Sequence, residues 1–327
     1  MGKKSTRILT GIQSTGTPHL GNIMGAIIPA IQMSQTKNSE SYLFIADLHS
    51  LTQIKDQKAL SHNTYATAAA WLAFGLDHKK TVFYRQSDIP QVTELAWYLS
   101  CYFPYQRLTL AHSFKDKQNR LQDVNSGLFN YPMLMAADIL LYDANIVPVG
   151  KDQLQHLEIT RNVANRFHNI NGETFIVPQA DLNNENMSIP GTDGQKMSKS
   201  KNNIIDVFLD EKKLKKQIQG IKTDSAPIED SKDWGKCNLF DIYKLIASKP
   251  EIADLKSKYE KGGYGYGQAK EELFALILNN FSKERQEFNH YLNNLDEIDK
   301  ILEAGATKAK ETANTVLKRV RKKLGYN

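Results

Sequence analysis

Short apolar runs typical of buried strands alternate with helix-forming segments over the first 190 residues of the chain. Strands that are separated by helices pair in parallel, in a sheet that helices cover on both faces. The sequence therefore predicts an α/β domain built on a parallel sheet. The expected strands are Arg7–Ile12, Ser41–Ala46, Thr81–Tyr84 and Ile146–Gly150, and the expected helices are residues 19–35, 59–74, 92–102, 134–142 and 153–167.

The strand signal ends near residue 191, and the chain reads as helical from Asp206 onward, with breaks at residues 223–235, 248–250 and 262–267. A length of 327 residues is enough for about two domains. We expect a sheet domain over residues 1–195, a connecting loop over 196–205, a helical domain over 206–295 and a C-terminal helix over 296–327.

Basic residues are concentrated in two zones of a chain whose formal net charge is +6. Residues 305–327 hold seven Lys or Arg and one acidic residue, and residues 196–222 hold eight Lys and three acidic residues. These two basic zones favour a polyanionic partner. The alternative for the C-terminal zone is a solvated helix face without a partner.

Several classes of protein are excluded by simple patterns. The longest nearly apolar stretches, Ala68–Leu76 and Leu134–Tyr142, are too short for a membrane-spanning helix, and we expect no secretion leader. The two cysteines, Cys101 and Cys237, are far apart in the sequence, which favours a reducing compartment and no structural zinc site. The pair His156 and Glu158 resembles part of a zinc deaminase motif, but no PCxxC follows it.

The first expected strand leads into a turn of small residues, Ser14–Asn22 (STGTPHLGN), that opens the first helix. A helix N-terminus presents free N–H groups and a positive dipole end, both of which suit a phosphate. Small residues allow a nucleotide to approach the backbone. This turn predicts a nucleotide site, although many α/β proteins have a glycine in their first turn.

The second motif is Lys196–Ser200 (KMSKS), in a polar loop that contains glycine. Two lysines three residues apart, flanked by hydroxyls, can hold the β- and γ-phosphates of a triphosphate. A loop also permits closure after the nucleotide binds. The alternative is a surface loop that happens to be rich in Lys and Ser.

Together the two motifs resemble the HIGH and KMSKS signatures of class I aminoacyl-tRNA synthetases. The segments between them are similar to those of the bacterial tryptophanyl-tRNA synthetases, and the resemblance covers nearly the whole chain. It implies a Rossmann-like (HUP-type) nucleotide-binding domain followed by a smaller, all-helical tRNA-binding domain. The similar segments are Tyr131-Pro132, Leu134–Tyr142 (LMAADILLY), Ile146–Gly150 (IVPVG), Asp152-Gln153, His156 and Arg161.

The resemblance implies roles for particular residues of this chain. Those for ATP are Gln13, Ser14, Thr15, His19, Gly21, Asn22, Gly150, Lys151, Asp152, Asn186, Lys196, Met197, Ser198, Lys199 and Ser200. Those for tryptophan are Asp138, expected to accept the indole N–H, with Leu9, His49, Tyr131, Met135, Val147, Val149 and Gln153. Those for catalysis are Lys196, Lys199, Lys117, Gln13 and Asn22.

This chain departs from the family's usual pattern at a few positions. Asn22 replaces the second His of HIGH, which keeps a hydrogen-bond donor, and Ser113 and Lys151 stand where the family commonly has Gln and an acidic residue. The loop before KMSKS has one residue more than expected, which affects the placement of Asn186.

The implied reaction activates tryptophan with ATP and then transfers it to the 3′ end of tRNA(Trp). The amino-acid carboxylate is already ionised, so positioning and phosphate charge stabilisation are enough for catalysis. We expect Mg²⁺ to arrive with ATP, no organic cofactor and no resident metal or zinc. The resemblance also implies a homodimer in the cytoplasm, without a membrane partner, whose basic zones contact tRNA.

Three alternatives differ from this interpretation. A tyrosyl-tRNA synthetase shares the fold, but a phenol site needs partners for a hydroxyl, whereas Asp138 stands alone in an apolar run and suits the single donor of an indole. A nucleotidyltransferase without RNA would need neither a helical domain nor a basic tail. A non-enzymatic paralogue would be expected to have lost the KMSKS lysines.

Overall fold

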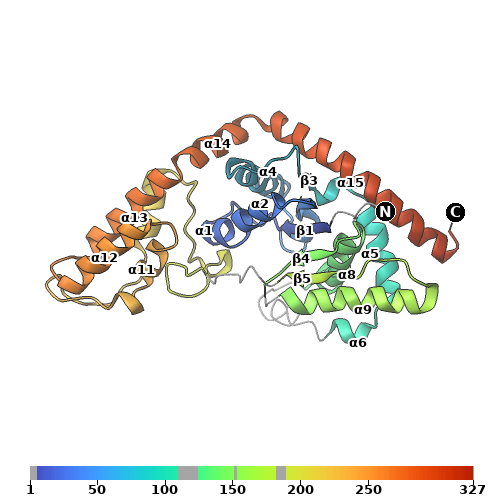
Figure 1. Ribbon diagram of the computed structural model, residues 1–327, viewed down its shortest axis with the longest axis horizontal. Coiled ribbons are helices and arrows are strands. Elements are labelled where there is room, and N and C mark those ends of the chain that lie inside the picture. The colour runs from blue at the N-terminus through green and yellow to red at the C-terminus, as the bar shows by residue number, and fades with distance from the viewer. Residues whose placement is uncertain (1–5, 110–123, 151–152, 182–188, 327) are drawn as a thin grey trace.

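A five-stranded parallel sheet forms the centre of the protein (Figure 1). The computed structural model describes residues 6–109, 124–150, 153–181 and 189–326. The strand order is β3-β2-β1-β4-β5. The strands are β1 (Thr6–Ile12), β2 (Ser39–Ile45), β3 (Val82–Arg85), β4 (Ile146–Pro148) and β5 (Gln179–Asp181). The sequence predicts the first four, but not β5, because its three residues form no apolar run.

Helices cover both faces of the sheet, as the alternating pattern predicts. One face packs against α1 (Leu20–Asn22), η1 (Ile23–Ile27), α2 (Ile28–Ser34) and α4 (Gln57–Ala73). The other packs against α5 (Gln91–Tyr102), α8 (Ser126–Leu140) and α9 (Leu154–Asn171). Shorter helices are α3 (Asp47–Ser50), η2 (Gln86–Asp88) and α6 (Tyr105–Leu108).

The expected first helix has a five-residue π-helical segment, η1, in its middle. Pro29 follows this segment and has no backbone N–H, so the regular hydrogen-bond ladder is interrupted there. Wider π turns are frequent at functional sites. This one lies directly after the HIGH-like turn.

The order of the strands places a crevice beside β1. The chain passes from β1 outward through β2 to β3, and then crosses to β4 and β5 on the other side of β1. β1 and β4 share only the pair Ile8 and Ile146, so they separate toward their carboxyl ends. Parallel sheets bind ligands at such a reversal of strand order.

The second half of the chain is helical, which confirms the predicted fold class. Figure 1 shows α11 to α13 gathered at one end of the molecule, and α14 leading back toward the sheet. The helices are α10 (Glu211–Gln219), η5 (Trp234–Lys236), α11 (Asn238–Tyr243), α12 (Lys249–Lys261), α13 (Tyr266–Asn280), α14 (Ser282–Asn293) and α15 (Leu295–Leu324), with a turn η4 (Lys199–Lys201) before them.

The basic C-terminal helix α15 packs along the sheet domain (Figure 1). Arg85 forms an ion pair with Asp299 at 2.8 Å near its beginning. Near its end, Arg319 pairs with Asp143, and Arg321 with Glu94 at 3.3 Å. Part of the predicted basic tail is therefore neutralised within the chain. The small and apolar residues that α15 buries are Ile298, Leu302, Gly305, Ala306, Ala309, Ala313, Val316, Leu317 and Val320.

Gly305 lets α15 rest directly on the backbone of β3. A Cβ atom at this position would lie 1.7 Å from the carbonyl oxygen of Phe83. We expect Gly305→Ala to displace the helix and to lower the free energy of unfolding by about 1–3 kcal/mol. The measurement is urea denaturation followed by far-ultraviolet circular dichroism.

The matched control is Gly267→Ala, in α13, where an added Cβ meets nothing within 4 Å. This substitution should leave the stability unchanged or raise it slightly, because alanine favours helix more than glycine does. Equal free energies of unfolding for the two variants would show that the contact with Phe83 carries no strain.

Candidate active site

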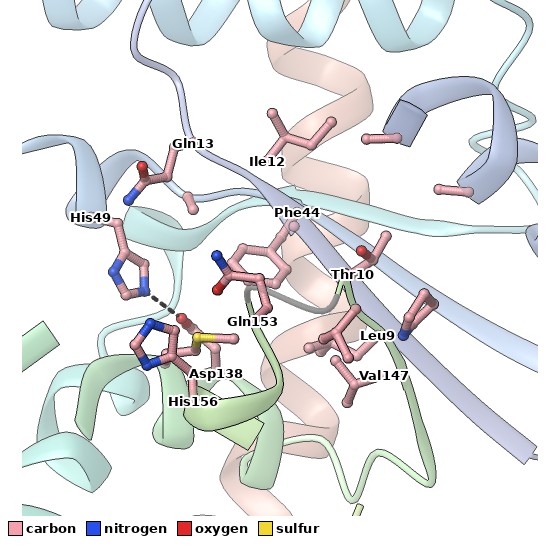
Figure 2. Close-up of a pocket in the computed structure, with 18 of the residues that line it drawn as sticks. Leu9, Thr10, Ile12, Gln13, Phe44, His49, Asp138, Val147, Gln153 and His156 are labelled. Atoms are coloured by element: carbon pink, nitrogen blue, oxygen red, sulfur yellow. Dashed lines mark hydrogen bonds and ion pairs between the residues drawn. The ribbon is translucent and has the colours of Figure 1, made fainter. Parts of the chain in front are cut away.

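A pocket of about 540 Å³ lies in the crevice beside β1. Its walls come from the carboxyl ends of β1 and β4, from α1, η1 and α2 on one face of the sheet, and from α3, α8 and α9 on the other. Figure 2 shows His49, Asp138 and His156 together at one side and Leu9 and Val147 at the other. The pocket thus joins a polar corner to an apolar slot.

All eight residues that the resemblance implies for the amino acid line this pocket: Leu9, His49, Tyr131, Met135, Asp138, Val147, Val149 and Gln153. Of those implied for the nucleotide, the lining includes Gln13, Thr15, Asn22 and Gly150. Four predicted residues lie outside the described part of the chain: Lys117, Lys151, Asp152 and Asn186. Their roles, like those of the lining residues, stay predictions.

Asp138 is the carboxylate of the pocket, and it has two partners. Its side chain comes from α8 and the residue is only 3% exposed. His49 Nε2 lies 2.8 Å from Oδ2, and the Gln86 amide donates to Oδ1 at 2.8 Å and Oδ2 at 2.9 Å. Burial raises the pKa of Asp138, while the hydrogen bonds from His49 and Gln86 oppose this rise. The Asp138 carboxylate, which lies within an apolar run of the sequence, is therefore held by side chains from two other elements, α3 and η2.

His156 is a pocket residue to which the sequence motifs assign no binding role. Its Nε2 lies 2.5 Å from the hydroxyl of Tyr131, and both residues are buried. His156 stands three residues after Gln153 at the start of α9, so the two side chains share a helix face. That spacing is a signal by which it could have been found.

The HIGH-like turn is organised by a reciprocal cap at the start of α1. His19 Nδ1 accepts the N–H of Asn22 at 3.3 Å, and Asn22 Oδ1 accepts the N–H of His19 at 3.2 Å. Burial and the charge of Lys199 lower the pKa of His19 to about 4, so the ring is neutral with its proton on Nε2. Ser14 instead faces the interior, where its hydroxyl lies 3.1 Å from that of Ser50. A contact between Ser14 and ATP would therefore involve the backbone of Ser14 and not its hydroxyl.

The KMSKS loop docks on this turn. Met197 is buried, and its sulfur accepts the N–H of Gly21 at 3.3 Å. Asn203 organises the loop, since its Oδ1 accepts the N–H of Ser198 at 2.7 Å and its amide donates to Asp193 at 2.6 Å. Asn203 is a structural residue that the sequence patterns did not single out. The hydroxyl oxygens of Ser198 and Ser200 lie 2.9 Å apart and form a hydrogen bond.

The two lysines of the loop occupy different environments. The side chain of Lys199 lies over Gly16, where an added Cβ would be 3.1 Å from Nζ, and the positive φ of Gly16 favours glycine. Burial lowers the pKa of Lys199 to about 8, although the charge of Asp206 opposes this shift. Lys196 is exposed. The structure therefore brings Lys199 to the first turn, and the role of Lys196 stays a prediction.

Neither a metal cluster nor a membrane span is found within the described residues. No group of three or more His, Cys, Asp and Glu side chains is arranged to hold a metal ion in that part of the chain. No helix there has the length and apolar character needed to cross a membrane.

The fold and the two docked motifs define a class I tRNA synthetase. The model of the family "tRNA synthetases class I (W and Y)" matches residues 1–283, and the chain belongs to this family. Among its relatives, the tryptophan–tRNA ligase of Campylobacter jejuni is 45% identical over 319 residues, which is 98% of this chain and 99% of that protein. The tryptophan–tRNA ligase of Rhodopirellula baltica is 44% identical over 319 residues, with the same coverage.

A solved structure supports the same assignment. The chain is similar to the crystal structure of Campylobacter jejuni tryptophanyl-tRNA synthetase complexed with ADP and tryptophan, with a TM-score of 0.93 and 45% identity. The match covers 98% of this chain and 100% of that one. The family resemblance seen in the motifs is thereby confirmed.

Proposed function

We propose that this chain activates L-tryptophan with ATP and transfers it to the 3′ end of tRNA(Trp). The observation that carries the proposal is the 45% identity to a tryptophan–tRNA ligase over nearly the whole length of both proteins. The pocket supports it with an apolar slot that ends at one buried carboxylate, which suits the single N–H donor of an indole. The reaction belongs in the cytoplasm, where ATP and tRNA meet.

In the first step, a carboxylate oxygen of tryptophan attacks the α-phosphorus of ATP. The new bond joins oxygen to phosphorus, and the bond from the α-phosphorus to the pyrophosphate oxygen breaks. Negative charge builds on the leaving pyrophosphate, so positive groups must face it. Lys199 lies at the turn where the triphosphate would lie. The N–H groups at the start of α1 do not supply this charge, because those of Leu20, Gly21 and Asn22 are already bonded to Ile205, Met197 and His19. Mg²⁺ enters with ATP and is held mainly by the phosphates.

In the second step, a ribose hydroxyl of the 3′-terminal adenosine attacks the activated carbonyl, and AMP leaves. The tRNA must reach the pocket with its 3′ end and must also contact the two basic zones. Exposed lysines lie on α10, a helix that packs against α13, and near the end of α15, a helix that packs along the sheet domain (Figure 1). These separated zones suit a long polyanion whose phosphates are contacted at several places.

A homodimer would let one tRNA span two subunits. Large apolar side chains are exposed on three neighbouring elements: Trp97 on α5 (69%), Tyr105 on α6 (68%) and Ile170 on α9 (71%). Exposed apolar surface of this kind favours a protein contact. We propose that this side of the sheet domain meets the second subunit.

Charging assays test the proposed function directly. Purified protein should attach labelled tryptophan to a tRNA(Trp) transcript and should not attach labelled tyrosine to a tRNA(Tyr) transcript. Light scattering of the same sample should give twice the mass of one chain. Charging of tRNA(Tyr) with tyrosine would overturn the proposal.

The lowered pKa of Lys199 predicts that ATP binding depends on pH. The amine must be protonated to bind phosphate, and in the free protein it loses its proton as the pH rises through about 8. Bound triphosphate favours the protonated form, so ATP binding above pH 8 must take up a proton. The affinity should fall by roughly tenfold per pH unit there.

Isothermal titration calorimetry at pH 7, 8 and 9, in buffers with different ionisation enthalpies, measures both the affinity and the proton uptake. The control is Lys199→Arg, whose side chain stays charged over this range. This variant should bind ATP with a nearly constant affinity. Equal affinities at pH 7 and pH 9 for the unmodified protein would contradict the assignment of Lys199 to the phosphates.

A further inference from the structure

We propose that Gln86 is a positioning residue for the amino-acid pocket. Its side chain holds the Asp138 carboxylate so that Oδ1 keeps an acceptor site for the indole N–H. Gln86 is not among the residues that line the pocket, so it acts through Asp138. The inference rests on the proposed activation of tryptophan.

Gln86 is held at both ends of its side-chain amide. It begins η2 directly after β3 and is 1% exposed. Its Oε1 accepts the backbone N–H groups of Leu48 at 3.1 Å and His49 at 3.4 Å. Because the oxygen faces these donors, the NH₂ group must face Asp138. One side chain therefore joins the backbone of α3 to the carboxylate of α8.

The hydrogen bonds leave the two oxygens of Asp138 in different states. Oδ2 faces both His49 Nε2 and the Gln86 amide, at 2.8 and 2.9 Å. Oδ1 receives the Gln86 amide at 2.8 Å. A carboxylate oxygen can accept two hydrogen bonds, so the two donors fill Oδ2 while Oδ1 retains a site for a ligand. Gln86 also fixes the plane of the carboxylate, because it contacts both oxygens.

The charge of Asp138 depends on the same contacts. Burial disfavours the ionised carboxyl, and donors to its oxygens restore it. The other titratable groups that face it are His49 from α3, Tyr84 from β3 and Tyr142 after α8. Burial raises the pKa of both tyrosines, so both stay neutral near pH 7. Without Gln86, the carboxyl would take up a proton at higher pH and would become a weaker acceptor for the indole.

Two substitutions separate this role from a merely structural one, because they predict opposite pH dependences. Gln86→Met keeps the shape but removes the donor, so the KM for tryptophan should rise about tenfold at pH 6 and recover as the pH increases. Gln86→Glu can donate only while the introduced carboxyl keeps a proton. Its KM for tryptophan should therefore be lowest at pH 6 and rise toward pH 9.

The experiment measures tryptophan-dependent pyrophosphate exchange from pH 6 to pH 9 for the unmodified protein and both variants. The KM for ATP should stay unchanged, and circular dichroism should show that the variants fold. The control is Gln57→Met, at an exposed position of α4, which should keep the unmodified profile.

Opposite slopes of KM against pH for the two variants would support the proposal. Profiles that match the unmodified protein, or a loss that is equal at every pH, would overturn it. If Gln86→Met does not fold, the sign of the slope for Gln86→Glu decides alone. Failure of the unmodified protein to exchange with tryptophan would instead overturn the proposed function.

Discussion

Replacing Lys199 by alanine should lower the rate of adenylate formation by on the order of 10²-fold or more, with a much smaller change in the affinity for tryptophan. The side chain lies over Gly16 at the first turn, on the proposed path of the triphosphate. Charge builds on the pyrophosphate only as its bond to the α-phosphorus breaks. The ammonium group therefore stabilises the transition state more than the ground state.

Pre-steady-state measurement of adenylate formation gives the rate, and tryptophan titration gives the affinity. The control is Lys201→Ala, which removes an exposed lysine of the same loop whose partner is Gln195. This control should retain most of the activity. A Lys199→Ala variant with an intact rate and weakened tryptophan binding would contradict the role at the phosphates.

Replacing Asp138 by asparagine should lower kcat/KM for tryptophan by roughly 10- to 10³-fold, the range of one charge-assisted hydrogen bond. An ionised carboxylate accepts the indole N–H in a charge-assisted hydrogen bond, which is stronger than a bond to a neutral acceptor. The substituted amide already faces donors from His49 and Gln86, which will attract its only oxygen. Its NH₂ group would then face the indole donor.

Asp138→Asn should also reduce the preference of the protein for tryptophan over phenylalanine. Phenylalanine fits an apolar slot but leaves the remaining acceptor site of the Asp138 carboxylate without a donor, which costs about 1–3 kcal/mol in the unmodified protein. Pyrophosphate exchange with tryptophan, tyrosine and phenylalanine measures the change in both proteins. Unchanged selectivity in a folded variant would show that another residue reads the indole.

The sequence predicts the parts of the fold and site that are local. Apolar runs identify four strands, and the spacing of Met135 and Asp138 places both on one face of α8 and in one pocket. Apolar runs do not identify β5, because its pairing with β4, rather than its composition, makes it a strand. The KMSKS motif identifies the loop, but only folding brings Met197 to Gly21, 176 positions away.

Gln86 shows why the rest could not be predicted. It belongs to no motif, and its partner Asp138 lies 52 positions away on another element. The charge of the tail is a similar case. The basic residues near the C-terminus predict a polyanionic partner, yet Arg319 and Arg321 form ion pairs with Asp143 and Glu94. Composition gives the number of charged residues, but only the folded structure shows which of them form ion pairs within the chain and which can contact a ligand.

Pyrophosphate exchange with each of the twenty amino acids in turn tests the proposed specificity most directly. We expect L-tryptophan to support rapid, ATP-dependent exchange, and tyrosine and phenylalanine to support little or none at the same concentration. Exchange that is as fast with tyrosine as with tryptophan, or no exchange with any amino acid, would contradict the proposed activation of tryptophan.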